Sequence, residues 1–241
     1  MNSASSRHTT SQESRKKMDI NLRQAREIII MAITESISVI LMGIPGIGKT
    51  EIIEKTTEKA GIGFLCYEAP SLDPTDVRGF LIPEGKESHF TRSPLMPDPK
   101  KHGKRGILLI DELPSGLPAV QIALHPLFHP KERRLGEDKI PQGWIPFATG
   151  NYTSDGAGAH ALLTALSDRV CILNVVPDYQ VWKEDYAIPN GVHPVSIGLL
   201  NFRPDLFSTF EKRNKADKGK TFASPRTHQM ASKVLHYAEY T

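Results

Sequence analysis

One short stretch of the chain combines side chains that suit the binding of a polyphosphate. Residues 43–50 read Gly43-Ile44-Pro45-Gly46-Ile47-Gly48-Lys49-Thr50, which fits the pattern G-x-x-x-x-G-K-[ST]. The three glycines leave little side-chain bulk, so several backbone N–H groups can converge on an anion. Lys49 adds a positive charge for the outer phosphates, and the Thr50 hydroxyl can bind Mg²⁺. The alternative is a Gly/Pro turn that ends in Lys-Thr by coincidence.

The residues on either side of this loop favour the phosphate-binding interpretation. Residues 37–42 form an apolar run typical of a strand, and residues 51–55 have the composition of a helix. A helix that begins near Gly48 would direct its unpaired N–H groups and its positive dipole end at the anion. We therefore predict that Gly43 through Glu51 form the nucleotide-binding loop.

A pair of acidic residues follows a second apolar run. Asp111 and Glu112 come directly after residues 106–110, which read as a strand. Asp111 would lie at the carboxyl end of this strand, beside the loop, and hold Mg²⁺ directly or through water. Glu112 would orient or activate the attacking water. The alternative is a pair of solvated acids at the start of a helix, but the phosphate loop upstream favours the catalytic hypothesis.

Composition restricts the class of protein. The chain has 241 residues, of which 39% are apolar and 24% charged, as expected of a soluble globular protein with a substantial core. It shows neither an apolar run of membrane-spanning length nor a secretory signal. Cys66 and Cys171 lie in apolar runs, so we expect buried free thiols, a reducing compartment and a cytoplasmic location. The net charge of +3 is too small to indicate nucleic-acid binding by itself.

Apolar runs that alternate with helical stretches predict the architecture. Five strands are expected at about 37–42, 64–67, 106–110, 144–149 and 170–175. Helices are expected at 20–35, after the phosphate loop, at 117–128 and at 159–168. This order predicts an α/β fold, with a five-stranded parallel sheet covered by helices on both faces.

We predict three regions along the chain. Residues 1–17 are polar and form a disordered leader. Residues 18–177 form the nucleotide-binding core, within which residues 80–105 are an irregular segment with room for a hairpin. Residues 178–241 lack strand patterning and form a small helical lid.

The ordered set of motifs resembles the AAA+ ATPases, specifically their MoxR-like and dynein-related branch, and covers about residues 20–235. The matching stretches are Gly43–Thr50, Ser71–Gly79, Leu108–Pro114, Val120–Leu124, Ala148–Asn151, Leu162–Arg169 and Ala223–Arg226. The resemblance implies a P-loop αβα sandwich with a C-terminal helical lid, and ATP with Mg²⁺ as substrate and cofactor. The predicted lid is short for this family, so we expect a neighbour or partner to help it clamp the nucleotide.

The resemblance also implies roles for three further residues. Asn151, at a strand end, matches the polar residue that helps to orient the attacking water, although it could simply cap a turn. Arg169 matches the arginine finger that reaches the neighbouring subunit's nucleotide, although a structural ion pair is the alternative. Arg226 matches the lid arginine that senses the outer phosphate, although it could be an ordinary cation on a helix surface.

The implied assembly is a ring of identical subunits, typically a hexamer, that remodels or activates a protein partner. Relatives often work with a von Willebrand A-type protein, but no residue here identifies one. A nucleic-acid motor is the rival hypothesis, with phosphate contacts from the cluster Lys100, Lys101, Lys104 and Arg105 or from Lys212, Arg213, Lys215, Lys218 and Lys220. A nucleotide-binding switch without turnover is a third, which the presence of both Glu112 and Asn151 argues against.

Overall fold

The computed structural model describes residues 19–152, 166, 168–212 and 220–239. Its centre is a parallel sheet of six strands in the order β1-β10-β2-β9-β6-β3. Their bounds are β1 Asp19–Ile20, β2 Val39–Met42, β3 Gly63–Glu68, β6 Gly106–Asp111, β9 Trp144–Gly150 and β10 Cys171–Val175. The predicted parallel α/β sheet is confirmed, but the predicted count of five strands is wrong. β1 pairs through only two residues, too few to give a periodic sequence signal.

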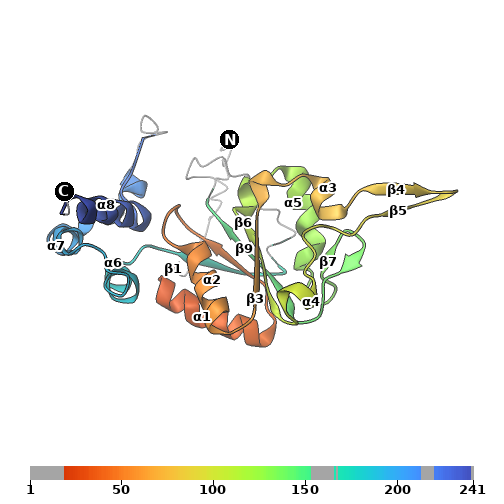
Figure 1. Cartoon of the computed structure of the whole chain (residues 1–241), viewed down its shortest axis with the longest axis horizontal. Helices are drawn as coiled ribbons and strands as arrows, with labels where there is room; N and C mark the ends of the chain where they lie inside the picture. Colours follow the sequence, from red (N-terminus) through yellow and green to blue (C-terminus); the bar gives the residue numbers. More distant parts are fainter. Residues whose placement is uncertain (1–18, 153–165, 167, 213–219, 240–241) are drawn as a thin grey trace, which may run out of the picture.

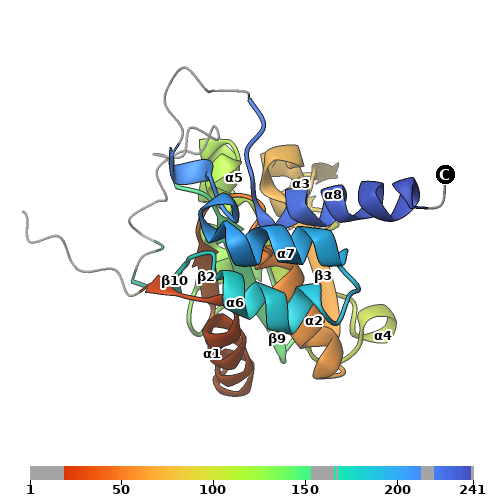
Figure 2. The same ribbon diagram turned by 90° about the vertical axis from the view of Figure 1, so that its left-hand side faces the viewer.

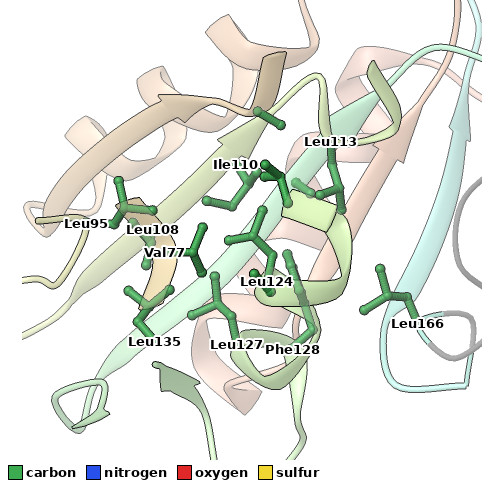
Figure 3. Packing of buried hydrophobic residues seen from close by; sticks show 14 of the residues in the cluster. Val77, Leu95, Leu108, Ile110, Leu113, Leu124, Leu127, Phe128, Leu135 and Leu166 are labelled. Atoms are coloured by element: carbon green, nitrogen blue, oxygen red, sulfur yellow. The ribbon is translucent and has the colours of Figure 1, made fainter. Parts of the chain in front are cut away.

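Alternate residues of each strand enter two different cores, as the pleat of a sheet requires. Ile40 and Leu108 face one core, whereas Leu41 and Leu109 face the other. On the first face the sheet is covered by α3 (Pro74–Arg78) and α5 (Pro118–Leu124), and Figure 3 shows Val77, Leu124 and Phe128 packed there. On the second face lie α1 (Leu22–Glu35) and α2 (Lys49–Lys59). This is an αβα sandwich (Figure 1).

Two hairpins and a short helix extend from the αβα sandwich. β4 (Leu81–Glu84) and β5 (Glu87–Phe90) pair in the segment that we predicted to have room for a hairpin, and they project well beyond the sheet (Figure 1). α4 (Pro99–His102) follows, and β7 (Arg134–Leu135) pairs with β8 (Asp138–Lys139). The helix predicted at 117–128 is instead α5 followed by a 3₁₀ turn, His125–Phe128, because Pro126 has no N–H group to continue the α-helical ladder.

The C-terminal helices enclose an apolar cluster of their own. α6 (Tyr179–Trp182) runs into a π-helical turn, Lys183–Ala187, and α7 (Pro194–Phe202) and α8 (Pro225–Ala238) lie beside it (Figure 2). Trp182, Leu200 and Phe207 are the larger members of this cluster. The predicted leader, and most of the helix predicted at 159–168, fall outside the described residues.

The cysteines differ from the prediction in one respect. Both are free thiols, as expected, but Cys66 is exposed and Cys171 is only partly buried. β3 is the outermost strand on its side of the sheet, so Cys66 has no strand beyond it.

Candidate nucleotide-binding site

The phosphate loop joins the carboxyl end of β2 to the first residue of α2. Gly46 and Gly48 have φ angles of 80° and 100°, in the left-handed region that glycine adopts without strain. A Cβ on Gly43 would lie 2.3 Å from the Val175 carbonyl oxygen, so only glycine fits there. Gly48 precedes Lys49, the first residue of α2. The loop therefore presents the N-terminus of an eleven-residue helix to any bound anion.

Lys49 is buried and held by three oxygen atoms. Its Nζ donates hydrogen bonds to the carbonyl oxygens of Gly43 at 2.8 Å and Ile44 at 2.9 Å, and to Asn151 Oδ1 at 2.9 Å. Asn151 is itself buried, just beyond the end of β9. The structure therefore brings the phosphate-loop lysine and the predicted water-orienting residue into direct contact.

Thr50 and Asp111 meet across the gap between α2 and β6. The Thr50 hydroxyl lies 3.0 Å from each carboxylate oxygen of Asp111. A hydroxyl and a carboxylate are the hard oxygen ligands that Mg²⁺ accepts alongside water and phosphate. This donor set therefore fits the magnesium site expected from the sequence.

Glu112 turns sharply out of the strand that precedes it. Its φ of 52° and ψ of 38° are left-handed, which is uncommon for a residue other than glycine. Its backbone N–H donates to Thr149 Oγ1 at 3.1 Å and to Asp111 Oδ1 at 3.2 Å. Both acidic residues line the same cavity.

That cavity has a volume of about 590 Å³ and lies between the sheet and the C-terminal helices. The core contributes the phosphate loop, Asp111, Glu112 and Asn151. The opposite wall comes from α6, the π-helical turn and α8, through Val181, Trp182, Asp185, Tyr186, Pro225, Arg226 and Gln229. Glu51 also lines the cavity and forms an ion pair with Lys55 at 2.7 Å. The space suits a ligand with a polyphosphate at one end and an apolar group at the other.

The N-terminus of α8 touches the phosphate loop. Ser224 caps this helix by accepting a hydrogen bond from the Thr227 N–H group. The Arg226 N–H lies 3.3 Å from the Gly46 carbonyl oxygen. Arg226 therefore lies at the cavity.

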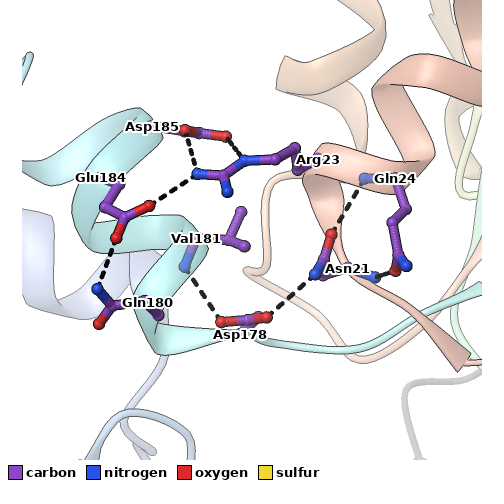
Figure 4. A network of polar contacts seen from close by, with 8 residues as sticks. All are labelled: Asn21, Arg23, Gln24, Asp178, Gln180, Val181, Glu184 and Asp185. Carbon is purple, nitrogen blue, oxygen red and sulfur yellow. Dashed lines mark hydrogen bonds and ion pairs between the residues drawn. The ribbon is translucent and has the colours of Figure 1, made fainter.

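A polar network ties the C-terminal helices to α1 (Figure 4). Arg23 donates hydrogen bonds to Asp185 at 2.7 and 2.9 Å and to Glu184 at 2.9 Å. These bonds lower the pKa of both carboxyl groups and raise the pKa of the guanidinium. Asn21 adds a bond to Asp178 at 3.1 Å.

Arg169 stands apart from the other predicted site residues. It does not line the cavity and lies just before β10, whereas the phosphate loop follows the opposite end of the neighbouring strand β2. Its Nη1 lies 3.5 Å from His125 Nδ1 and its Nε 3.9 Å from Asp168 Oδ1. The basic cluster at 100–105 directly precedes the amino end of β6, and none of its four basic residues lines the cavity.

Several residues of the site could not be found from the sequence. Arg23 and Tyr186 belong to no recognisable motif, and Thr149 lies in the matching stretch Ala148–Asn151 without a role of its own in the prediction. Only the folded chain brings the three residues to the cavity. Trp182 carries the one weak signal, because an aromatic residue in a polar helical stretch often packs against a ligand or a core.

The fold and the site together define a P-loop nucleotide-binding protein. A family model for the AAA domain of the dynein-related subfamily matches residues 38–170. This is more than half of the chain, which therefore belongs to that family and is an AAA+ ATPase.

Two solved structures have a similar arrangement. A mutant of RuvB from Thermotoga maritima gives a TM-score of 0.55 at 16% identity, over 88% of this chain and 60% of that one. A candidate ATPase from Cytophaga hutchinsonii gives 0.48 at 20% identity, over 69% of this chain and 51% of that one. The chain thus spans 51–60% of the length of these two proteins. None of the curated proteins matches it. Among the described helices, none is both long and apolar enough to cross a membrane.

Proposed function

We propose that the chain hydrolyses ATP in a Mg²⁺-dependent reaction, works as a ring of identical subunits and uses the energy to remodel or activate a protein partner. The observation that carries the chemical part is the meeting of Thr50, Asp111 and Glu112 at one wall of the cavity. An oxygen donor set for a cation and an acidic residue beside it are what phosphoryl transfer to water requires.

Each residue of the cavity has a distinct task in this proposal. Lys49 and the loop N–H groups bind the phosphates, and Thr50 with Asp111 would hold Mg²⁺, which neutralises charge on the phosphates when bound. Glu112 orients the attacking water and accepts its proton. Asn151 helps to place that water and keeps Lys49 in position.

The C-terminal helices supply the remaining contacts to the nucleotide. Arg226 enters from α8 and would contact the outer phosphate. Because α8 also bonds to the phosphate loop through Gly46, a change at the phosphates can reach the C-terminal helices directly.

Arg169 acts in trans in this proposal. It lies outside the cavity of its own subunit and is partly exposed, with 29% of its side chain accessible. A guanidinium in such a position can neutralise developing charge only at a neighbour's nucleotide. This arrangement supports a ring, and a hexamer is our proposal for its size.

The projecting hairpin β4–β5 supports a protein partner rather than a nucleic acid. Phe80, Leu81, Ile82 and Phe90 are exposed on it, and grouped apolar side chains of this kind mark protein contacts. DNA binding that weakens steeply with salt would instead support the nucleic-acid motor.

The test compares steady-state ATP hydrolysis of the wild type and Glu112→Gln in the presence of Mg²⁺. We expect the variant to bind nucleotide normally and to lose about a hundredfold or more in kcat. Glu54→Gln is the matched control, since Glu54 lines the same cavity from α2 and has no role in holding the metal or activating water in this proposal. Equal rates for the Glu112 variant and the wild type would overturn the proposed chemistry.

A further inference from the structure

The hydroxyl of Thr149 forms hydrogen bonds with both acidic residues of the site. Thr149 is 1% exposed and lies one residue before the end of β9. Its Oγ1 donates a hydrogen bond to Asp111 Oδ1 and accepts one from the Glu112 N–H at 3.1 Å. A hydroxyl has one donor and two acceptor lone pairs, so this one group serves both acidic residues at once.

The first of these bonds fixes the rotation of the Asp111 carboxylate. Thr50 approaches both carboxylate oxygens from α2, whereas Thr149 donates to Oδ1 from β9. With a donor from each neighbouring element, the carboxylate has one preferred orientation. Without Thr149 the carboxylate would keep the Thr50 hydroxyl and the Glu112 N–H at 3.2 Å, but it would lose its donor from β9.

The second bond supports the left-handed backbone of Glu112. A residue with a side chain at φ 52° is held there by its surroundings. Its N–H is shared between Thr149 and Asp111, so loss of the Thr149 oxygen removes one of its two acceptors. The direction in which Glu112 leaves the strand depends on this turn.

The end of β9 is itself well fixed. A Cβ on Gly150 would lie 2.6 Å from Pro114 Cδ, so the strand packs tightly against the turn that follows Glu112. Asn151 binds Lys49 two residues beyond Thr149. One strand end thus orders the phosphate-loop lysine and both acidic residues.

We propose that Thr149 is a positioning residue for hydrolysis, which orients Asp111 for the metal and Glu112 for the attacking water. This inference rests on the proposed function. It assigns Thr149 an effect on metal affinity and on kcat, and none on nucleotide affinity in the absence of metal.

The test compares Thr149→Val, which keeps the shape and removes the hydroxyl, with Thr149→Ser, which keeps the hydroxyl. Thr57→Val is the control, because Thr57 is buried and its hydroxyl donates to the Ile53 carbonyl oxygen within its own helix, α2. Three quantities are measured. They are Mn²⁺ affinity of the ADP-bound protein by electron paramagnetic resonance, kcat for ATP, and hydrogen exchange of the Glu112 amide.

We expect Thr149→Val to weaken Mn²⁺ binding and lower kcat by about tenfold to a hundredfold each, and to speed exchange at Glu112. ADP affinity without metal should stay within about twofold of the wild type. Thr149→Ser and Thr57→Val should resemble the wild type. Unchanged Mn²⁺ affinity and Glu112 exchange in Thr149→Val would overturn the inference, as would equal losses in the serine variant. If Glu112→Gln hydrolyses ATP normally, the proposed chemistry fails, but the metal and exchange measurements still decide the role of Thr149.

Discussion

Two separate features of the structure require glycine at position 46. Its φ of 80° places it in the left-handed region, and a Cβ there would lie 2.9 Å from Ser224 Oγ. The first requirement shapes the phosphate loop, and the second allows α8 to approach it. Gly46 occupies a variable position of the G-x-x-x-x-G-K-[ST] pattern, so the sequence indicates the first requirement only through the glycine-rich composition of the loop. The second depends on a contact between residues far apart in the chain, which no local pattern reports.

Gly46→Ala should therefore impair nucleotide binding beyond its cost in stability. Gly61→Ala is the matched control, because Gly61 has a φ of 64° and open space around its Cα. Each alanine should lower the free energy of unfolding by about 1 kcal/mol through left-handed strain. Only Gly46→Ala should also weaken ADP binding, by about tenfold or more, since its Cβ displaces Ser224. Thermal unfolding and titration with fluorescent ADP measure the two effects, and equal ADP affinities would contradict the contact.

The polar side chains at strand ends were the most predictable residues of the site. Asp111, Glu112 and Asn151 each follow an apolar run, and parallel strands bring their carboxyl ends to one edge of a sheet. Thr149 was not predicted as a site residue because it lies within a strand, where threonine is a common residue type. What distinguishes it is the pair of bonds to Asp111 and Glu112, which exists only after folding.

At the scale of elements, the sheet was predictable and the lid contacts were not. The buried runs of β2, β6 and β9 stand out because both faces are covered. β1 is too short for such a signal. The contact between the C-terminal helices and α1 depends on charged residues such as Arg23 and Asp185. In a sequence, such residues cannot be distinguished from ordinary solvent-exposed charges.

The bridge from Arg23 to Glu184 and Asp185 should hold the C-terminal helices over the cavity. Arg23→Ala should raise KM for ATP by about twofold to fivefold, as expected for an exposed ion-pair network. Arg203→Ala is the matched control, because Arg203 bonds Asp205 at 2.8 Å through two nitrogens within the C-terminal helices. If both variants raise KM equally, the bridge has no special role in the site.

The same bridge has a defined dependence on pH. Arg23 lowers the pKa of Glu184 and Asp185 by hydrogen bonding, so its stabilisation is present above the ordinary carboxyl pKa of about 4. It is lost as the pH falls through the lowered values. The difference in unfolding free energy between the wild type and Arg23→Ala should therefore be constant from about pH 5 to 8 and shrink below about pH 4. Urea titrations across this range measure it, and a difference that grows on acidification would contradict the assignment.

At the scale of the whole molecule, one residue predicted for the site, Arg169, lies away from the cavity of its own subunit. Arg169 lies at the amino end of β10 and contacts His125 and Asp168, whereas the cavity opens at the carboxyl ends of the strands. The proposed ring would resolve this separation, because a head-to-tail contact would present the face of one subunit that bears Arg169 to the cavity of the next. The contact between Arg169 and a neighbour's cavity cannot be seen in a single subunit, so it has to be tested by an experiment on the assembled protein.

Mixing two inactive variants provides that test. Arg169→Ala and Glu112→Gln should each lower the rate by about a hundredfold or more, because one lacks the finger and the other the water-orienting acid. In a mixed ring, a Glu112→Gln subunit can lend its intact Arg169 to the cavity of an Arg169→Ala neighbour, whose Glu112 is intact. The mixture should therefore be more active than either variant alone, and the wild-type rate per subunit should rise with protein concentration. Arg134→Ala, which removes an exposed cation paired with Glu132, should change neither result. Normal hydrolysis by Arg169→Ala at every concentration would show that each subunit completes its own site. The proposal that Arg169 acts at a neighbour's nucleotide would then be wrong, and the active site would give no argument for a ring.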